Sequence, residues 1–112
     1  MVQPDQKPER RVRDKHVFRE LHGRWRDCAL CGSTDSLSLH HILKRADDVE
    51  PNLVMLCGDG VRGCHGRVEA HDEATLHALA THLLNKRPDT VAYLMEKLGT
   101  VAAADWFKRQ MT

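Results

Sequence analysis

Residues 28–43, "CALCGSTDSLSLHHIL", place a pair of cysteines shortly before a stretch in which polar and apolar residues alternate. The alternation over residues 36–42 predicts a half-buried strand. Side chains of neighbouring strand residues point to opposite faces, so His40 and His41 make a poor pair of ligands for one ion. We therefore expect one of these histidines to bind a metal ion and the other to stay free for proton transfer.

A second pair of cysteines flanks the glycine-rich segment "GDGVRG", residues 58–63, and residues 53–57, "LVMLC", are a second strand candidate. Glycine tolerates the backbone angles that a tight loop needs, so the wide second spacing can fold back on itself. Structural zinc is held by four tetrahedral sulfur or nitrogen ligands. Two alternatives are four free thiols and a site in which His65 replaces a cysteine. The favoured prediction is a structural zinc ion held by Cys28, Cys31, Cys57 and Cys64.

Apolar residues at helical spacing predict the remaining elements. One helix is expected over residues 9–22, with Gly23 as its stop. Residues 65–85 are also helical in pattern, with a break near Asp72 as an alternative. Two further helices are expected, within residues 87–99 with Asp89 as cap and Gly99 as stop, and over residues 100–111 with Thr100 as cap.

The chain has 112 residues, which predicts one small domain over residues 1–112, and only 4% of them are aromatic, so a structural metal would help to stabilise it. No secretory segment and no apolar run of membrane length is present, which predicts a cytoplasmic protein that does not bind membranes. Thiols stay reduced in that compartment and more often bind metal there. Although the net charge is only +1, residues 1–27 carry a basic surplus. This surplus is typical either of an arm that contacts a phosphate-rich partner or of a solvated helix face.

Three motifs, "LHHIL", "EPNLVMLC" and "GCHGRVEAH", stand in the order of a histidine pair, an asparagine and a histidine directly after the last cysteine. This order resembles the HNH endonucleases, which are ββα-metal nucleases, in the subgroup whose hairpin is anchored by a four-cysteine zinc site. The segment "LCGDGVRGCHGRVE" looks like the form common in bacteriophage-encoded members. The resemblance implies an α+β fold with a core over residues 25–75, a basic helical arm over residues 1–24 and a helical extension over residues 76–112.

The resemblance also implies a role for each motif residue. His40 and His65 would bind a catalytic divalent cation, which could be Mg²⁺, Mn²⁺, Ni²⁺ or Zn²⁺. His41 would be the general base, and Asn52 would tie down the loop that helps to hold the base. Glu69 is either a further ligand, because residues four apart share a helix face, or a surface residue. The basic residues expected to bind DNA are Arg24, Arg26, Lys44, Arg45 and Arg67.

The function that follows is a metal-dependent DNA endonuclease that leaves 5′-phosphate and 3′-hydroxyl ends. A neutral imidazole can accept a proton from water near neutral pH, and a cation with only two protein ligands keeps positions open for phosphate oxygens. The alternative is a non-catalytic zinc module that binds DNA or protein. The helical extension is expected to pack on the N-terminal helix or to form a homodimer face. Besides DNA, a DNA-processing protein of a phage or its host is an expected partner.

Overall fold

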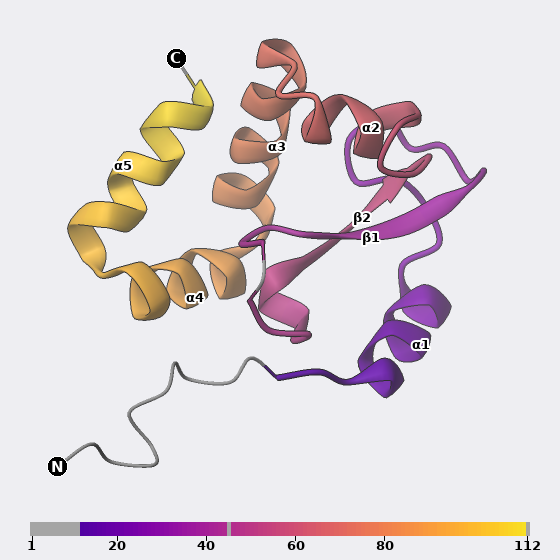
Figure 1. Ribbon diagram of the computed structural model, residues 1–112, viewed down its shortest axis with the longest axis horizontal. Coiled ribbons are helices and arrows are strands. Elements are labelled where there is room, and N and C mark those ends of the chain that lie inside the picture. Colours follow the sequence, from indigo (N-terminus) through magenta and orange to yellow (C-terminus); the bar gives the residue numbers. More distant parts are fainter. Residues whose placement is uncertain (1–11, 45, 112) are drawn as a thin grey trace, which may run out of the picture.

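A two-stranded antiparallel sheet lies at the centre of the computed structural model, which describes residues 12–44 and 46–111. Strand β1 (Leu37–His41) pairs with strand β2 (Leu53–Cys57), as Figure 1 shows. The predicted α+β class is confirmed, and β2 covers the residues that were predicted for it. The paired residues are Leu37 with Cys57, Ser38 with Leu56, Leu39 with Met55, His40 with Val54, and His41 with Leu53.

Helix α1 (Lys15–Arg24) covers one face of this sheet. Leu21 of α1 is buried in a cluster with three residues that share one strand face, Leu39, Leu53 and Met55. The helix begins after Asp14, whose carboxylate accepts a hydrogen bond from the backbone N–H of His16. An acceptor side chain at this position stabilises the first helical turn.

The predicted bounds of this helix were wrong at its C-terminal end. Gly23 does not stop the helix, which continues to Arg24 and ends where Trp25 takes an extended conformation. A glycine inside a helix costs only about 1 kcal/mol relative to alanine, so packing of Leu21 outweighs its effect. The predicted start was also wrong, because residues 12–14 precede the helix, and residues 9–11 lie outside the described part of the chain.

In the described part of the chain, four further α-helices lie on the opposite face of the sheet, and the short 3-10 helix η2 (Glu50–Asn52) precedes β2 (Figure 1). They are α2 (Gly63–Glu69), α3 (Glu73–Lys86), α4 (Pro88–Leu98) and α5 (Thr100–Met111). Their apolar side chains join those of the sheet in one buried cluster, which includes Val54, Leu56, Val68, Leu79, Leu83, Leu94 and Phe107. The helical extension therefore packs on the sheet, and the expectation that it packs on the N-terminal helix was wrong.

Local contacts explain the helix boundaries in this extension. The break near Asp72 is confirmed: its carboxylate accepts hydrogen bonds from the backbone N–H and the hydroxyl of Thr75. The cap predicted at Asp89 was wrong, because α4 begins at Pro88, a residue suited to the first helical turn, and Asp89 pairs with the guanidinium of Arg87. Gly99 ends α4 at a φ of 86°, as predicted.

Thr100, predicted as a cap, is the first residue of α5. Among the described residues, no helix combines the length and the apolar character needed to cross a membrane.

Candidate functional site

The four cysteines come together at one end of the hairpin. Cys28 and Cys31 lie on a turn in which the N–H of Gly32 donates to the Cys28 carbonyl. The N–H of Ala29 donates to the carbonyl of Met55 and so connects this turn to β2. Cys57 ends β2 and Cys64 lies in the first turn of α2. The sulfur atoms of the four cysteines all lie within 4.8 Å of one another.

This spacing fits one tetrahedral zinc ion. Zinc–sulfur bonds of about 2.3 Å place neighbouring sulfur atoms about 3.8 Å apart in a tetrahedron, and the Sγ atoms of Cys31 and Cys57 are 3.6 Å apart. Burial and the neighbouring thiols raise the pKa of Cys64 to about 12, because each additional negative sulfur is disfavoured without a cation. A bound divalent cation would remove this repulsion, so the donor set suits a metal site such as zinc.

The six residues between Cys57 and Cys64 form a closed loop. Gly58 and Gly63 have φ angles of 87° and 68°, and a Cβ atom at Gly63 would lie 2.5 Å from the Cys57 carbonyl oxygen. The carboxylate of Asp59 accepts hydrogen bonds from the N–H groups of Val61 and Arg62. The wide spacing is therefore compatible with a four-cysteine site, and His65 belongs to a different cluster.

A second group of metal-ligand types lies between β1 and α2. One ligand atom from each of His40, His65 and Glu69 lies within 4.8 Å of the other two. Oε2 of Glu69 is 3.1 Å from Nδ1 of His40 and 3.7 Å from Nε2 of His65, and the two imidazole rings meet edge to face at 5.2 Å. Of the two alternatives for Glu69, this contact agrees with a ligand position beside the two histidines.

The chemistry of this cluster suits a divalent cation. His40 is only 5% exposed, and its buried Nδ1 makes no aligned hydrogen bond despite its distance to Glu69. Burial and then the nearby His65 lower the pKa of His40 to about 4, so its ring is neutral with a lone pair available. Lys44 bonds the other oxygen of Glu69 at 2.8 Å and is the largest cause of that carboxyl's lowered pKa. Two neutral imidazoles and a carboxylate are a common donor set for divalent transition metals.

His41 lies on the other side of β1, as the alternation along the strand predicted. Its Nε2 atom is 2.7 Å from Oδ1 of Asp48, and its ring lies 5.8 Å from that of Phe18 in α1. An ionised carboxylate can only accept a hydrogen bond, so in the neutral form of the ring the proton is on Nε2 and the lone pair on Nδ1. A cavity of about 270 Å³ is lined by His41 together with Leu39, Lys44, His65 and Glu69.

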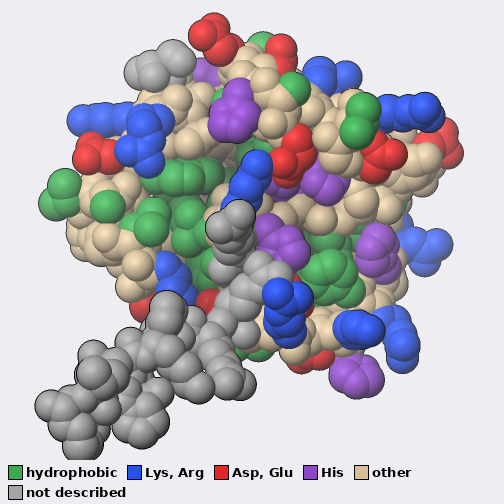
Figure 2. All heavy atoms as spheres, viewed as in Figure 1, with side chains coloured by type: hydrophobic (Ala, Val, Ile, Leu, Met, Phe, Trp, Pro, Cys, Tyr) green, Lys and Arg blue, Asp and Glu red, His purple; other side chains and the backbone are tan. Residues whose placement is uncertain are grey.

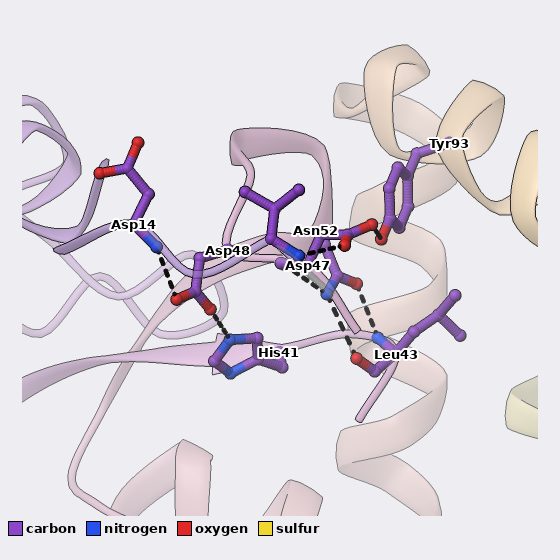
Figure 3. Close-up of polar contacts among 8 residues, drawn as sticks. Asp14, His41, Leu43, Asp47, Asp48, Asn52 and Tyr93 are labelled. Carbon is purple, nitrogen blue, oxygen red and sulfur yellow. Dashed lines mark hydrogen bonds and ion pairs between the residues drawn. The ribbon is translucent and has the colours of Figure 1, made fainter. Parts of the chain in front are cut away.

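Asn52 fixes the loop between the strands. It is fully buried, and its side chain accepts from the N–H of Leu43 and donates to the carbonyls of Leu43 and Asp47 (Figure 3). The loop-holding role implied by the resemblance agrees with these contacts. The side chain that forms a hydrogen bond with His41, however, is that of Asp48, so Asn52 is connected to His41 through the loop that carries Asp48.

The predicted DNA-binding residues are placed in different surroundings. The guanidinium of Arg24 pairs with Glu50, and that of Arg67 donates to the sulfur of Cys64. Lys44 lies at the His40–His65–Glu69 cluster, Arg26 is exposed, and Arg45 lies outside the described residues. On the face shown in Figure 2, basic and acidic side chains are interspersed rather than gathered into one basic patch. Of these residues, Lys44 is the one that lines the cavity beside the cluster.

Sequence reasoning missed the two neighbouring acids of the loop. Asp48 contacts His41, and Asp47 accepts from the N–H of Val12 and the hydroxyl of Tyr93 (Figure 3). Paired acids in a short segment between a histidine pair and an asparagine were a visible signal. The partners of Asp47 could not be read from the sequence, because they come from the N-terminal segment and from α4, and the contact of Asp48 with His41 depends on the path of the loop.

In comparisons with known proteins, no family model, curated protein or solved structure matches this chain.

Proposed function

We propose that this protein is a metal-dependent DNA endonuclease that hydrolyses phosphodiester bonds. The observation that carries the proposal is the arrangement of three imidazoles. His40 and His65 converge with Glu69, while the neighbouring His41 stays outside that cluster and borders the same cavity as His65 and Glu69. This arrangement separates a cation site from a proton acceptor, as phosphodiester hydrolysis requires.

The residues have distinct tasks in the proposed reaction. A divalent cation held by His40, His65 and Glu69 would supply Lewis-acid stabilisation of the phosphate oxygens and of the departing 3′ oxygen. His41, through its unprotonated Nδ1, accepts a proton from the attacking water. Asp48 holds the Nε2–H of His41 and stabilises the imidazolium that forms. Lys44 lines the same cavity, and its ammonium would contact the phosphate.

Hydrolysis by this arrangement leaves a 5′-phosphate and a 3′-hydroxyl end. The cysteine cluster serves as a structural zinc site, because its four sulfur atoms leave no open position for a substrate. Phosphate contacts dominate the affinity, so binding is expected to weaken as salt rises.

Cleavage of supercoiled plasmid tests the proposal. Zinc-loaded protein is incubated with plasmid in the presence of Mg²⁺, Mn²⁺, Ni²⁺ or additional Zn²⁺, and nicked and linear products are measured. His41→Ala is expected to lower cleavage by about 10²- to 10⁴-fold, the usual contribution of a positioned base, while zinc content and DNA binding persist.

A matched control is His77→Ala, which removes an exposed histidine of α3 and should leave cleavage unchanged. Full activity of the His41→Ala protein would exclude the role proposed for this residue. Zinc binding with neither a second metal site nor cleavage would instead favour the non-catalytic zinc module.

A further inference from the structure

The hydroxyl of Ser38 joins the two candidate metal sites. Ser38 lies in β1 on the same face as His40, opposite Leu56 of β2. Its Oγ atom is 2.7 Å from the carbonyl oxygen of Gly58 and 2.6 Å from Nδ1 of His65 in α2. Gly58 directly follows Cys57, so one hydroxyl contacts both the loop of the cysteine cluster and a histidine of the second cluster.

Counting hydrogens assigns the direction of both bonds. A serine hydroxyl has one hydrogen to donate, and a carbonyl oxygen can only accept. Ser38 therefore donates to Gly58, and its oxygen accepts from an N–H at Nδ1 of His65. The opposite assignment would place two oxygen atoms 2.7 Å apart with no hydrogen between them.

This direction decides which nitrogen of His65 can bind a metal. A neutral imidazole carries one proton, so a protonated Nδ1 leaves the lone pair on Nε2. Nε2 is the atom that lies 3.7 Å from Oε2 of Glu69, within the cluster. Without the hydroxyl, the proton could occupy Nε2 and block the metal-binding lone pair.

We propose that Ser38 is a positioning residue that holds His65 in its Nδ1–H form and so presents Nε2 to a divalent cation bound with His40 and Glu69. Partners of this kind typically change metal affinity by about 10- to 100-fold. Because Ser38 also bonds the carbonyl next to Cys57, the zinc-binding loop and the second metal site are coupled through one side chain. The role of this cation in catalysis rests on the proposed nuclease function, whereas the state of His65 does not.

Nitrogen NMR of the imidazole rings tests the assignment directly. Long-range ¹H–¹⁵N correlation spectra of zinc-loaded protein at about pH 8, where an imidazole is neutral, distinguish a protonated ring nitrogen from a bare one. The wild-type spectrum is expected to show the proton on Nδ1 of His65. A proton on Nε2 would overturn the proposal without any variant being made.

Three variants then test the role of the hydroxyl. In Ser38→Ala, we expect His65 to lose its fixed form and the affinity for Ni²⁺, measured by calorimetry on zinc-loaded protein, to fall about 10- to 100-fold. Ser38→Thr keeps the hydroxyl in a strand position that accepts β-branched residues, and should restore the spectrum and affinity. Ser33→Ala removes a hydroxyl that bonds the N–H of Asp35 and should behave as wild type.

The outcomes separate this inference from the nuclease proposal. Unchanged Ni²⁺ affinity and an unchanged His65 spectrum in folded Ser38→Ala protein would overturn the role of Ser38, whatever the plasmid assay shows. Conversely, the expected spectra and affinities together with an inactive wild-type protein would support Ser38 and reject the nuclease.

Discussion

The carboxylate of Asp48 joins the proposed base to the start of α1: Oδ1 lies 2.7 Å from Nε2 of His41, and Oδ2 accepts a hydrogen bond from the N–H of Asp14 at 3.1 Å. The N–H of Asp48 in turn donates to the carbonyl of Val12. Asp48 is therefore held from several directions, and it can orient the His41 ring without moving during the reaction.

Replacing Asp48 tests this orienting role. Asp48→Ala should lower single-turnover cleavage by about 10- to 100-fold, which is part of what a positioned base contributes. Asp48→Asn keeps an oxygen that can accept from Nε2–H but loses the charge that stabilises the imidazolium, so we expect an intermediate rate. Asp105→Ala, at an exposed position of α5, is the matched control. A wild-type rate in Asp48→Ala would show that His41 needs no partner.

Asn52 is expected to be the most sensitive polar residue of the fold. Asn52→Ala would remove three hydrogen bonds to buried and half-buried backbone groups of Leu43 and Asp47, of which only the Leu43 carbonyl keeps a second bond, from the N–H of Ala46. Each such group costs about 1–3 kcal/mol, so we expect the free energy of unfolding to fall by about 2–4 kcal/mol. Urea unfolding followed by circular dichroism measures this change. Asn85→Ala, at an exposed position of α3, should change stability by less than about 0.5 kcal/mol. An equal loss of stability in both variants would show that the hydrogen bonds of Asn52 do not stabilise the fold.

Elements with a strong local signal could be predicted from the sequence. The run "LVMLC" is bounded by Pro51 and Asn52 on one side and Gly58 on the other, and it forms β2 as predicted. The break at Asp72 was also recognisable, because its carboxylate and Thr75 are close in sequence. The cysteine grouping followed from the ligand chemistry of zinc, which requires four donors at one point whatever the loop between them.

Features that depend on distant partners could not be predicted. Asp89 is of a residue type that often caps a helix, but its carboxylate pairs with the guanidinium of Arg87. This guanidinium also donates hydrogen bonds to the carbonyls of Glu50 and Leu53. The pairing of Asp48 with His41 likewise depends on the path of the loop. Local patterns cannot distinguish such residues from solvated ones, because their partners are brought near only by the complete fold.

Removing zinc should unfold the hairpin. The backbone of the turn carrying Cys28 and Cys31 is joined to β2 by the hydrogen bond from the N–H of Ala29 to the carbonyl of Met55, and the small core lies directly beside this turn. Metal binding of this kind contributes directly to folding, so a chelator should abolish the cooperative thermal transition. Glu69→Gln, which alters the second cluster and leaves the cysteines intact, should keep both zinc and the transition. A zinc-free protein that melts like the zinc-loaded one would rule out a structural role for the metal.

Gly66 is required for α2 to approach the preceding loop. A Cβ atom at Gly66 would lie 2.3 Å from the carbonyl carbon of Val61. A backbone atom cannot relieve such a clash by changing rotamer, as a side chain can. Gly66→Ala should therefore destabilise the protein by more than about 2 kcal/mol and displace the adjacent His65. Gly60→Ala is the matched control, because a Cβ atom there meets nothing within 4 Å. Thermal melting of both variants is the measurement. Destabilisation of Gly66→Ala alone would confirm the close approach of α2 to Val61, whereas equal destabilisation of both would mean that the loop tolerates neither substitution.

Asp47 should make the stability of the fold depend on acid pH. The N–H of Val12, the Tyr93 hydroxyl and the Lys97 ammonium lower the pKa of Asp47 against the opposing effect of burial. Because the folded protein binds this proton less readily than the unfolded chain, the ionised carboxylate stabilises the fold above its unfolded pKa of about 3.9. That contribution is lost as the pH falls through the lower pKa of the folded state.

Asp47→Asn measures this contribution by difference. At about pH 7 the variant should be less stable than wild type by about 2 kcal/mol, as for hydrogen bonds to a charged group. The difference should begin to shrink below about pH 4, where the unfolded wild-type chain takes up the proton, and should go on shrinking as the pH falls to the lower pKa of the folded state. Urea unfolding of both proteins at each pH is the measurement. Acid affects the cysteine cluster in both proteins alike, so this effect cancels in the difference. A difference that stays constant with pH would mean that the charge of Asp47 does not stabilise the fold.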